Sequence, residues 1–134
     1  MEDWKTKIAA LWVVYEFGGV WLPMLELYLP GFIEEITSGE MGGNPITPEL
    51  LLMLAILMLI APIMTFLSLT LKNTINRWAN IILGAIFAGF ALVFPIQYLT
   101  EQSAYSAFVI LIGIVQLVAA ALIVWYAWKS KQKA

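Results

Sequence analysis

The sequence has no cysteine and no histidine, and only 12% of its 134 residues are charged. The lack of cysteine excludes disulfides, thiolate catalysis, iron–sulfur clusters and cysteine-based zinc sites. The lack of histidine removes the usual haem ligand, the commonest metal ligand and the readiest proton shuttle. The GxxxxGKS/T phosphate-binding loop and the GxSxG nucleophile turn are also missing. We therefore expect a protein that is not an enzyme, with no catalytic residue, no metal site and no cofactor.

Apolar residues dominate instead: 62% of the residues are hydrophobic and the mean hydropathy is +0.88. Soluble domains average about half apolar and about a quarter charged residues, so this chain has too few charges to cover a water-facing surface. Seven basic and nine acidic residues give a net charge of −2, which argues against a nucleic-acid partner. The composition is typical of a membrane protein.

Four apolar stretches are each long enough to cross a bilayer core, which takes about 20 helical residues. They cover approximately residues 8–29, 50–71, 78–99 and 103–128 of a single domain, residues 1–134, with an outer loop over residues 30–47. Backbone groups in lipid need internal partners, so helices are the expected spanning form. The last two connections are short, which makes consecutive helices antiparallel neighbours. The sequence predicts an all-α, membrane-spanning four-helix up-and-down bundle.

Local signals mark where two helices begin or end. Thr47-Pro48-Glu49 supplies an N-cap, a first-turn proline and an acid at the start of the second stretch. In the outer loop, Phe32, Ile33 and Ile36 are spaced as one face of a short helix, with Gly39 as its stop. We favour a helix at the membrane surface over a lid that covers a substrate.

All seven basic residues fall on one side of the predicted bundle, whereas the other side carries only acidic charges. By the positive-inside rule, we expect a multi-pass protein of the cell membrane with both termini in the cytoplasm. Tryptophan and tyrosine residues cluster near both predicted interfaces, as is usual for membrane helices. The basic residues are Lys5, Lys7, Lys72, Arg77, Lys129, Lys131 and Lys133, and the aromatic residues near them are Trp4, Trp78, Trp125, Tyr126 and Trp128.

Four segments carry a resemblance: Met1–Lys5, Ile46–Leu51, Asn76–Ile81 and Trp125–Lys129. They look like the corresponding segments of a family of short four-span prokaryotic integral membrane proteins of uncharacterised function. The similarity covers nearly the whole chain. It implies one four-helix domain and carries over no activity, substrate or site residue.

Glu16 places a carboxyl group about 12 Å into the first apolar stretch, counted from Ile8. A charged side chain near the centre of a membrane helix costs roughly 2.5–3.5 kcal/mol, so Glu16 should face the interior and pair or stay protonated. Intramembrane acids are candidates for proton or ligand binding. The alternative is a neutral acid that hydrogen-bonds a neighbouring helix. Thr65, Ser68 and Gln116 are the polar residues expected near it.

A second polar layer near the outer face contains Glu26 and Gln97, which complete the candidate proton- or ligand-binding residues. We favour a Glu26 side chain that simply extends toward outer water. Glu26 and Glu16 are rotated by roughly 80° from a common helix face, so a straight relay along one helix is not expected.

Small residues recur at helical spacing in the last two stretches, which is typical of close helix packing. They are Gly84, Ala85, Ala88 and Gly89 in the third stretch, and Ser106, Gly113, Gln116 and Ala120 in the fourth.

Two functions fit these residues. The first, which we favour, is a non-enzymatic interaction or structural protein that packs against membrane lipid, another protein or itself, with Glu16 as an interior polar site. The alternative is a small proton- or cation-coupled transporter that acts as a homo-oligomer, because four short helices enclose little volume. Its plan is similar to that of small multidrug-resistance transporters, although their other signatures are not evident here. A lipid-modifying enzyme is the weakest option, since no base, nucleophile or metal site is evident.

Overall fold

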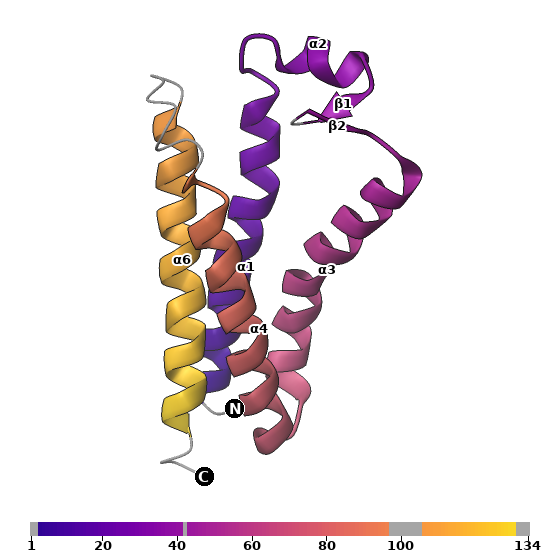
Figure 1. The fold of residues 1–134 in the computed structure, drawn as a ribbon. Helices are drawn as coiled ribbons and strands as arrows, with labels where there is room; N and C mark the ends of the chain where they lie inside the picture. The colour runs from indigo at the N-terminus through magenta and orange to yellow at the C-terminus, as the bar shows by residue number, and fades with distance from the viewer. Residues whose placement is uncertain (1–2, 42, 97–105, 131–134) are drawn as a thin grey trace.

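The computed structural model describes residues 3–41, 43–96 and 106–130, which form helices and one short hairpin (Figure 1). The elements are α1 (Asp3–Glu26), α2 (Phe32–Thr37), β1 (Glu40–Met41), β2 (Asn44–Pro45), α3 (Pro48–Thr70), α4 (Asn73–Val93) and α6 (Ser106–Lys129). Helices α1, α3, α4 and α6 are long and apolar enough to cross a membrane. The predicted all-α class is confirmed, and the four apolar helices fit a multi-pass membrane protein.

The two predicted local signals act as expected. The Thr47 hydroxyl accepts a hydrogen bond from the Leu50 backbone N–H at 3.1 Å and caps α3, which begins at Pro48. Helix α2 is followed by Gly39 in the left-handed region (φ 90°), and the Gly39 N–H donates to the Ile36 carbonyl. The hairpin that follows pairs Glu40 with Pro45 and was not predicted.

Helix α4 ends earlier than the sequence predicts. The apolar stretch continues to about residue 99, but the helix stops at Val93, two residues before Pro95. Proline has no N–H to donate, so the bond that would continue the helix to the Ala91 carbonyl is missing at Pro95, although Phe94 keeps helical geometry (φ −57°, ψ −40°). Pro95 packs instead against α6, where an added Cβ on Gly113 would lie 2.5 Å from the Pro95 Cγ.

Helix α6 packs along both α4 and α1, whereas α3 packs mainly on α1 and meets α4 only weakly beside their short connection. Figure 1 shows α3 leaning away from the other long helices toward its N-terminal end. The buried residues of α3, Ala61, Met64 and Ser68, accordingly all lie in its C-terminal half. The expectation that the second and third spans are neighbours along their length was therefore wrong, because a short turn fixes only where two helices meet.

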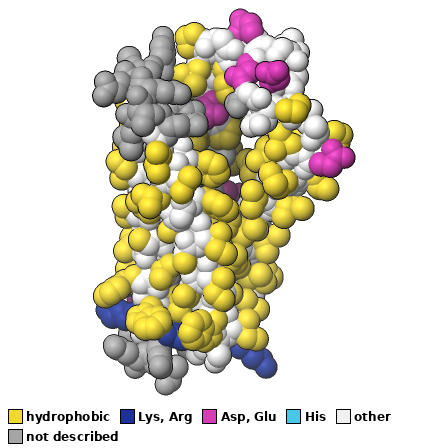
Figure 2. All heavy atoms as spheres, in the orientation of Figure 1, with side chains coloured by type: hydrophobic (Ala, Val, Ile, Leu, Met, Phe, Trp, Pro, Cys, Tyr) yellow, Lys and Arg dark blue, Asp and Glu magenta, His cyan; other side chains and the backbone are white. Residues whose placement is uncertain are grey.

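Charge separates along the bundle. The start of α1 and the end of α6 lie at the same end of the molecule (Figure 1). Figure 2 shows the Lys and Arg side chains at that end, whereas acidic side chains gather at the opposite end and within a hollow beside α3. We call these the basic end and the acidic end.

The core is built on three aromatic rings. Trp12 and Tyr15 of α1 meet Phe87 of α4 edge to face, with centroid distances of 5.6 and 5.2 Å. Edge-to-face pairs place the positive edge of one ring on the negative face of the next. Close approach of α4 and α6 needs Gly84, where an added Cβ would lie 2.8 Å from the Val124 Cγ2 and 3.2 Å from the Ile123 Cγ2.

We expect Gly84→Ala to destabilise the protein by about 1–3 kcal/mol, because the added methyl group overpacks the contact between α4 and α6. Gly89→Ala is the matched control on the same helix, since a Cβ there would meet nothing within 4 Å. That control should be neutral or slightly stabilising. Thermal unfolding in detergent, followed by circular dichroism, measures both. Equal unfolding temperatures for the two variants would contradict this account of the helix contact.

Candidate functional site

The best-defined polar feature of the interior is a hydrogen-bonded cluster centred on Asn80. Its side-chain oxygen accepts from the Trp12 indole N–H at 2.7 Å and from the Ser68 hydroxyl at 3.2 Å. Trp12, Ser68 and Asn80 are each fully buried and come from α1, α3 and α4. One amide therefore joins three helices, at a depth where water is scarce and an unpaired polar group is costly.

Asn76 lies one helical turn before Asn80 and completes the cluster. The Asn80 amide donates to the Asn76 side-chain oxygen at 2.7 Å, and the Asn76 amide donates to the Ser68 backbone carbonyl at 2.7 Å. Nearby, the Lys5 ammonium donates to the Leu71 carbonyl just beyond the end of α3. These bonds fasten the C-terminal end of α3 to α1 and α4.

Sequence reasoning missed this cluster. From the sequence, Asn76 and Asn80 have no role beyond the resemblance segment Asn76–Ile81. The available signal was a pair of asparagines four residues apart beside an apolar stretch, which places both on one helix face. That spacing does not say whether the face points inward, and α3 supplies half of the partners.

Gln116 joins α6 to α1. Its amide donates to the Tyr15 backbone carbonyl at 3.1 Å, and Gly18 makes room for it, since a Cβ there would lie 2.7 Å from the Gln116 Cγ. The Tyr15 hydroxyl in turn donates to the Phe87 carbonyl of α4 at 2.9 Å. Gln116 thus binds backbone and bridges two helices, which is how an amide in lipid usually acts.

Glu16 lies eleven residues, about three turns, after Lys5, whose ammonium bonds the Leu71 carbonyl at the end of α3, so its side chain lies on the face of α1 that turns toward α3. It is partly buried, and it makes no hydrogen bond or ion pair with any residue in the described part of the chain. The predicted neighbours are bonded elsewhere. The Thr65 hydroxyl donates to the Ala61 carbonyl of its own helix, the Ser68 hydroxyl donates to Asn80, and Gln116 binds Tyr15.

The remaining candidate residues do not join this group. Glu26 is the last residue of α1 and is partly buried at the acidic end. Gln97 lies outside the described residues.

The two small-residue patterns have different outcomes. All four members of the α6 stripe, Ser106, Gly113, Gln116 and Ala120, are buried. Of the four small residues on α4, only Gly84 is buried, whereas Ala85 and Gly89 are exposed. Ala85 and Gly89, which are four residues apart, therefore do not face the interior of this chain.

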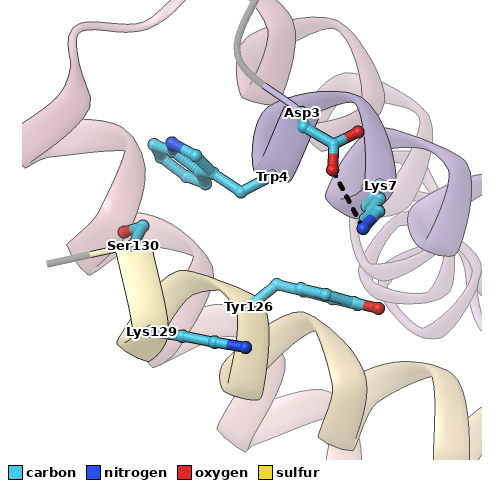
Figure 3. A pocket seen from close by; sticks show the side chains of 6 residues that line it. All are labelled: Asp3, Trp4, Lys7, Tyr126, Lys129 and Ser130. Atoms are coloured by element: carbon cyan, nitrogen blue, oxygen red, sulfur yellow. Dashed lines mark ion pairs between the residues drawn. The ribbon is translucent and has the colours of Figure 1, made fainter. Parts of the chain in front are cut away.

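A pocket of about 60 Å³ opens at the basic end between the first turn of α1 and the last turn of α6. Figure 3 shows Asp3, Trp4 and Lys7 on one side of it and Tyr126, Lys129 and Ser130 on the other. The Lys7 ammonium pairs with the Asp3 carboxylate at 2.9 Å. Sites for small organic ligands occupy about 300–1,000 Å³, so this pocket suits a few water molecules.

Four long apolar helices around a hydrogen-bonded polar interior fit a small all-helical, multi-pass membrane protein. The chain belongs to the DUF6326 family, a family of unknown function whose model matches residues 1–134. No curated protein and no solved structure matches it significantly. The resemblance to a family of uncharacterised membrane proteins is confirmed to that extent, and its prokaryotic origin stays a prediction.

Asn80→Leu should lower the free energy of unfolding by about 1–3 kcal/mol, because the buried Trp12 N–H loses its acceptor. Trp12→Phe removes the donor instead. The double variant should be more stable than the sum of the two single effects by about 1 kcal/mol, since neither partner is then left unpaired. Denaturant unfolding in detergent measures this cycle. Strictly additive effects would mean that the bond between Trp12 and Asn80 carries no net stability.

Proposed function

We propose that this protein is a non-enzymatic interaction protein of the membrane, and that its partner is a second copy of the same chain. The observation that supports the proposal is the carboxyl group of Glu16, which lies on the α3-facing side of α1 without a partner among the described residues. Three properties bear on it: the depth of this carboxyl, its chemistry and the apolar surface around it.

Depth is the first property. About 20 Å of helix separates Asp3 from Glu16, which puts the carboxyl near the middle of the 24-residue α1. A charged group at that depth costs roughly 2.5–3.5 kcal/mol, and a neutral acid there still needs hydrogen bonds. Trp12, Tyr15 and Gln116 find partners inside the chain. Glu16 therefore gains the most hydrogen-bonding free energy from a partner outside the chain.

The second property is the chemistry of the carboxyl and its partner. The described basic residues all belong to the basic end. A second copy therefore offers no cation at the level of Glu16 among these residues. A protonated carboxyl group carries one donor together with acceptor capacity, which makes it complementary to itself. A two-fold axis places the same residue of two copies opposite each other, so two Glu16 side chains can satisfy one another.

The third property is the apolar surface beside the carboxyl. Ala61 and Met64 are buried on the face of α3 that turns toward the bundle. Toward the N-terminal end, the same face continues at helical spacing with Leu57, Leu54 and Leu50. Helix α3 has diverged from α1 at that level (Figure 1), and Val20 of α1 is 45% exposed. Helices of a second copy would cover this surface with matching apolar side chains.

We further propose that the basic end faces the cytoplasm, so that both termini of the chain lie there. Lys5, Lys7, Lys72, Arg77 and Lys129 support this orientation, because basic residues near short membrane loops are retained on the cytoplasmic side.

A second candidate function is proton- or cation-coupled transport. The hollow beside α3 in Figure 2, where acidic atoms are visible, favours it. In that case Glu16 would exchange a proton or cation with water, whereas in the favoured function it holds two copies together.

Cysteine cross-linking in native membranes tests the proposal, since the chain has no cysteine of its own. Val20→Cys should form a cross-linked dimer under mild oxidation. Leu52→Cys is the matched control, because Leu52 is 63% exposed on the opposite face of α3. Adding Glu16→Leu to the Val20→Cys chain should lower the dimer fraction about threefold or more, the loss expected for one interhelical hydrogen bond.

Equal cross-linking at positions 20 and 52, or a dimer fraction that Glu16→Leu leaves unchanged, would overturn the proposal. Proton flux into proteoliposomes tests the second candidate function. If a monomeric protein carried a proton flux that Glu16→Gln abolished, transport would replace self-association as the function.

A further inference from the structure

Arg77 lies in the first two turns of α4 and touches two indole rings at the basic end. Its guanidinium carbon is 4.8 Å from the ring centroid of Trp78 and 5.2 Å from that of Trp128 on α6. A planar guanidinium can stack on an aromatic face and still direct its N–H groups outward. The two rings therefore hold the cation in place without using its hydrogen-bond donors.

Those donors are not used by the described part of the chain. The Arg77 Nε atom is buried without a hydrogen-bond partner, and no carboxylate in the described ranges pairs with this guanidinium. Asp3, the first acid in the described part of the chain, is paired with Lys7. No acceptor in the described part of the chain therefore compensates this guanidinium, and an anion that approaches the accessible part of the partly buried side chain would do so.

The surroundings indicate which anion. Lys5, Lys72 and Lys129 add positive charge at the same end, and Trp78 and Trp128 are 47% and 59% exposed. If the four apolar helices cross a bilayer, this end lies at one interface, where tryptophan rings prefer the headgroup level. Lipid phosphates occupy the same level.

We infer that Arg77, with Trp78 and Trp128, forms a binding site for the phosphate of an anionic phospholipid headgroup. The guanidinium presents two parallel N–H groups to two phosphate oxygens, a geometry that lysine cannot reproduce. The exposed parts of the two indoles lie against the glycerol and the upper acyl chains of the same lipid. The site is independent of Glu16, so the dimer proposal can fail without affecting it.

Native mass spectrometry of the full chain in detergent, titrated with short-chain phosphatidylglycerol, tests the site. Arg77→Gln should weaken binding of the first lipid about tenfold, the loss expected for a charge-assisted bidentate contact. Arg77→Lys keeps the charge but cannot make the bidentate contact, so its lipid affinity should lie between those of the unmodified chain and Arg77→Gln. Lys72→Gln removes the same charge from an exposed position at the same end and should change affinity less than about twofold.

Circular dichroism of each variant without lipid confirms that it is folded, and Arg77→Lys serves if Arg77→Gln does not fold. Equal losses for Arg77→Gln and Lys72→Gln would overturn the site in favour of general charge attraction. Full affinity in Arg77→Lys would overturn the bidentate contact. Displacement of the lipid by millimolar inorganic phosphate would overturn the assignment to a lipid, since the anion alone would then suffice.

Discussion

The hydrogen bonds that meet at the Asn80 side chain are the interaction on which the rest of the structure depends. In a bilayer, apolar helix faces gain little from burial against each other, because lipid is as apolar as leucine. Bonds between buried polar groups therefore decide which helices stay together. Asn80 ties α1 and α3 to α4 through Trp12 and Ser68, and Gln116 ties α6 to α1 through the Tyr15 carbonyl. Small residues then let the joined helices close up, as Gly84 does for α4 and α6.

The uneven placement of these bonds gives the molecule two different ends. The bonds of α3 to other helices involve Ser68 and Leu71, at the basic end, so its N-terminal half is free to diverge from α1. The divergence exposes one face of α1 at the level of Glu16, a carboxyl group that the chain itself leaves without a partner in the described ranges. The fastened basic end carries the proposed lipid site, and the open end carries the proposed contact with a second copy.

Much of the fold was accessible from the sequence, because the length and hydropathy of membrane helices are set by the bilayer alone. The cap at Thr47 and the stop at Gly39 were also predictable, since each needs only neighbouring residues. What could not be predicted depends on which helix lies beside which. Asn76 and Asn80 have the same spacing whether they face lipid or protein, and it is the placement of Trp12 and Ser68 on other helices that gives them partners. For the same reason Gly84 and Gly89 looked equivalent, and Gln116 was expected near Glu16 although it binds the Tyr15 backbone instead.

The central claim is that α3 is fastened to α1 at the basic end and separated from it at the acidic end. Pulsed electron paramagnetic resonance in nanodiscs measures this directly, using spin labels on introduced cysteines at exposed positions of the two helices. One pair, at Ala10 and Phe66, reports on the fastened end, and another, at Met24 and Leu51, on the open end. The account predicts a short, narrow distance distribution for the first pair and a longer one for the second. Two equally short and narrow distributions would contradict it, because α3 would then follow α1 along its whole length.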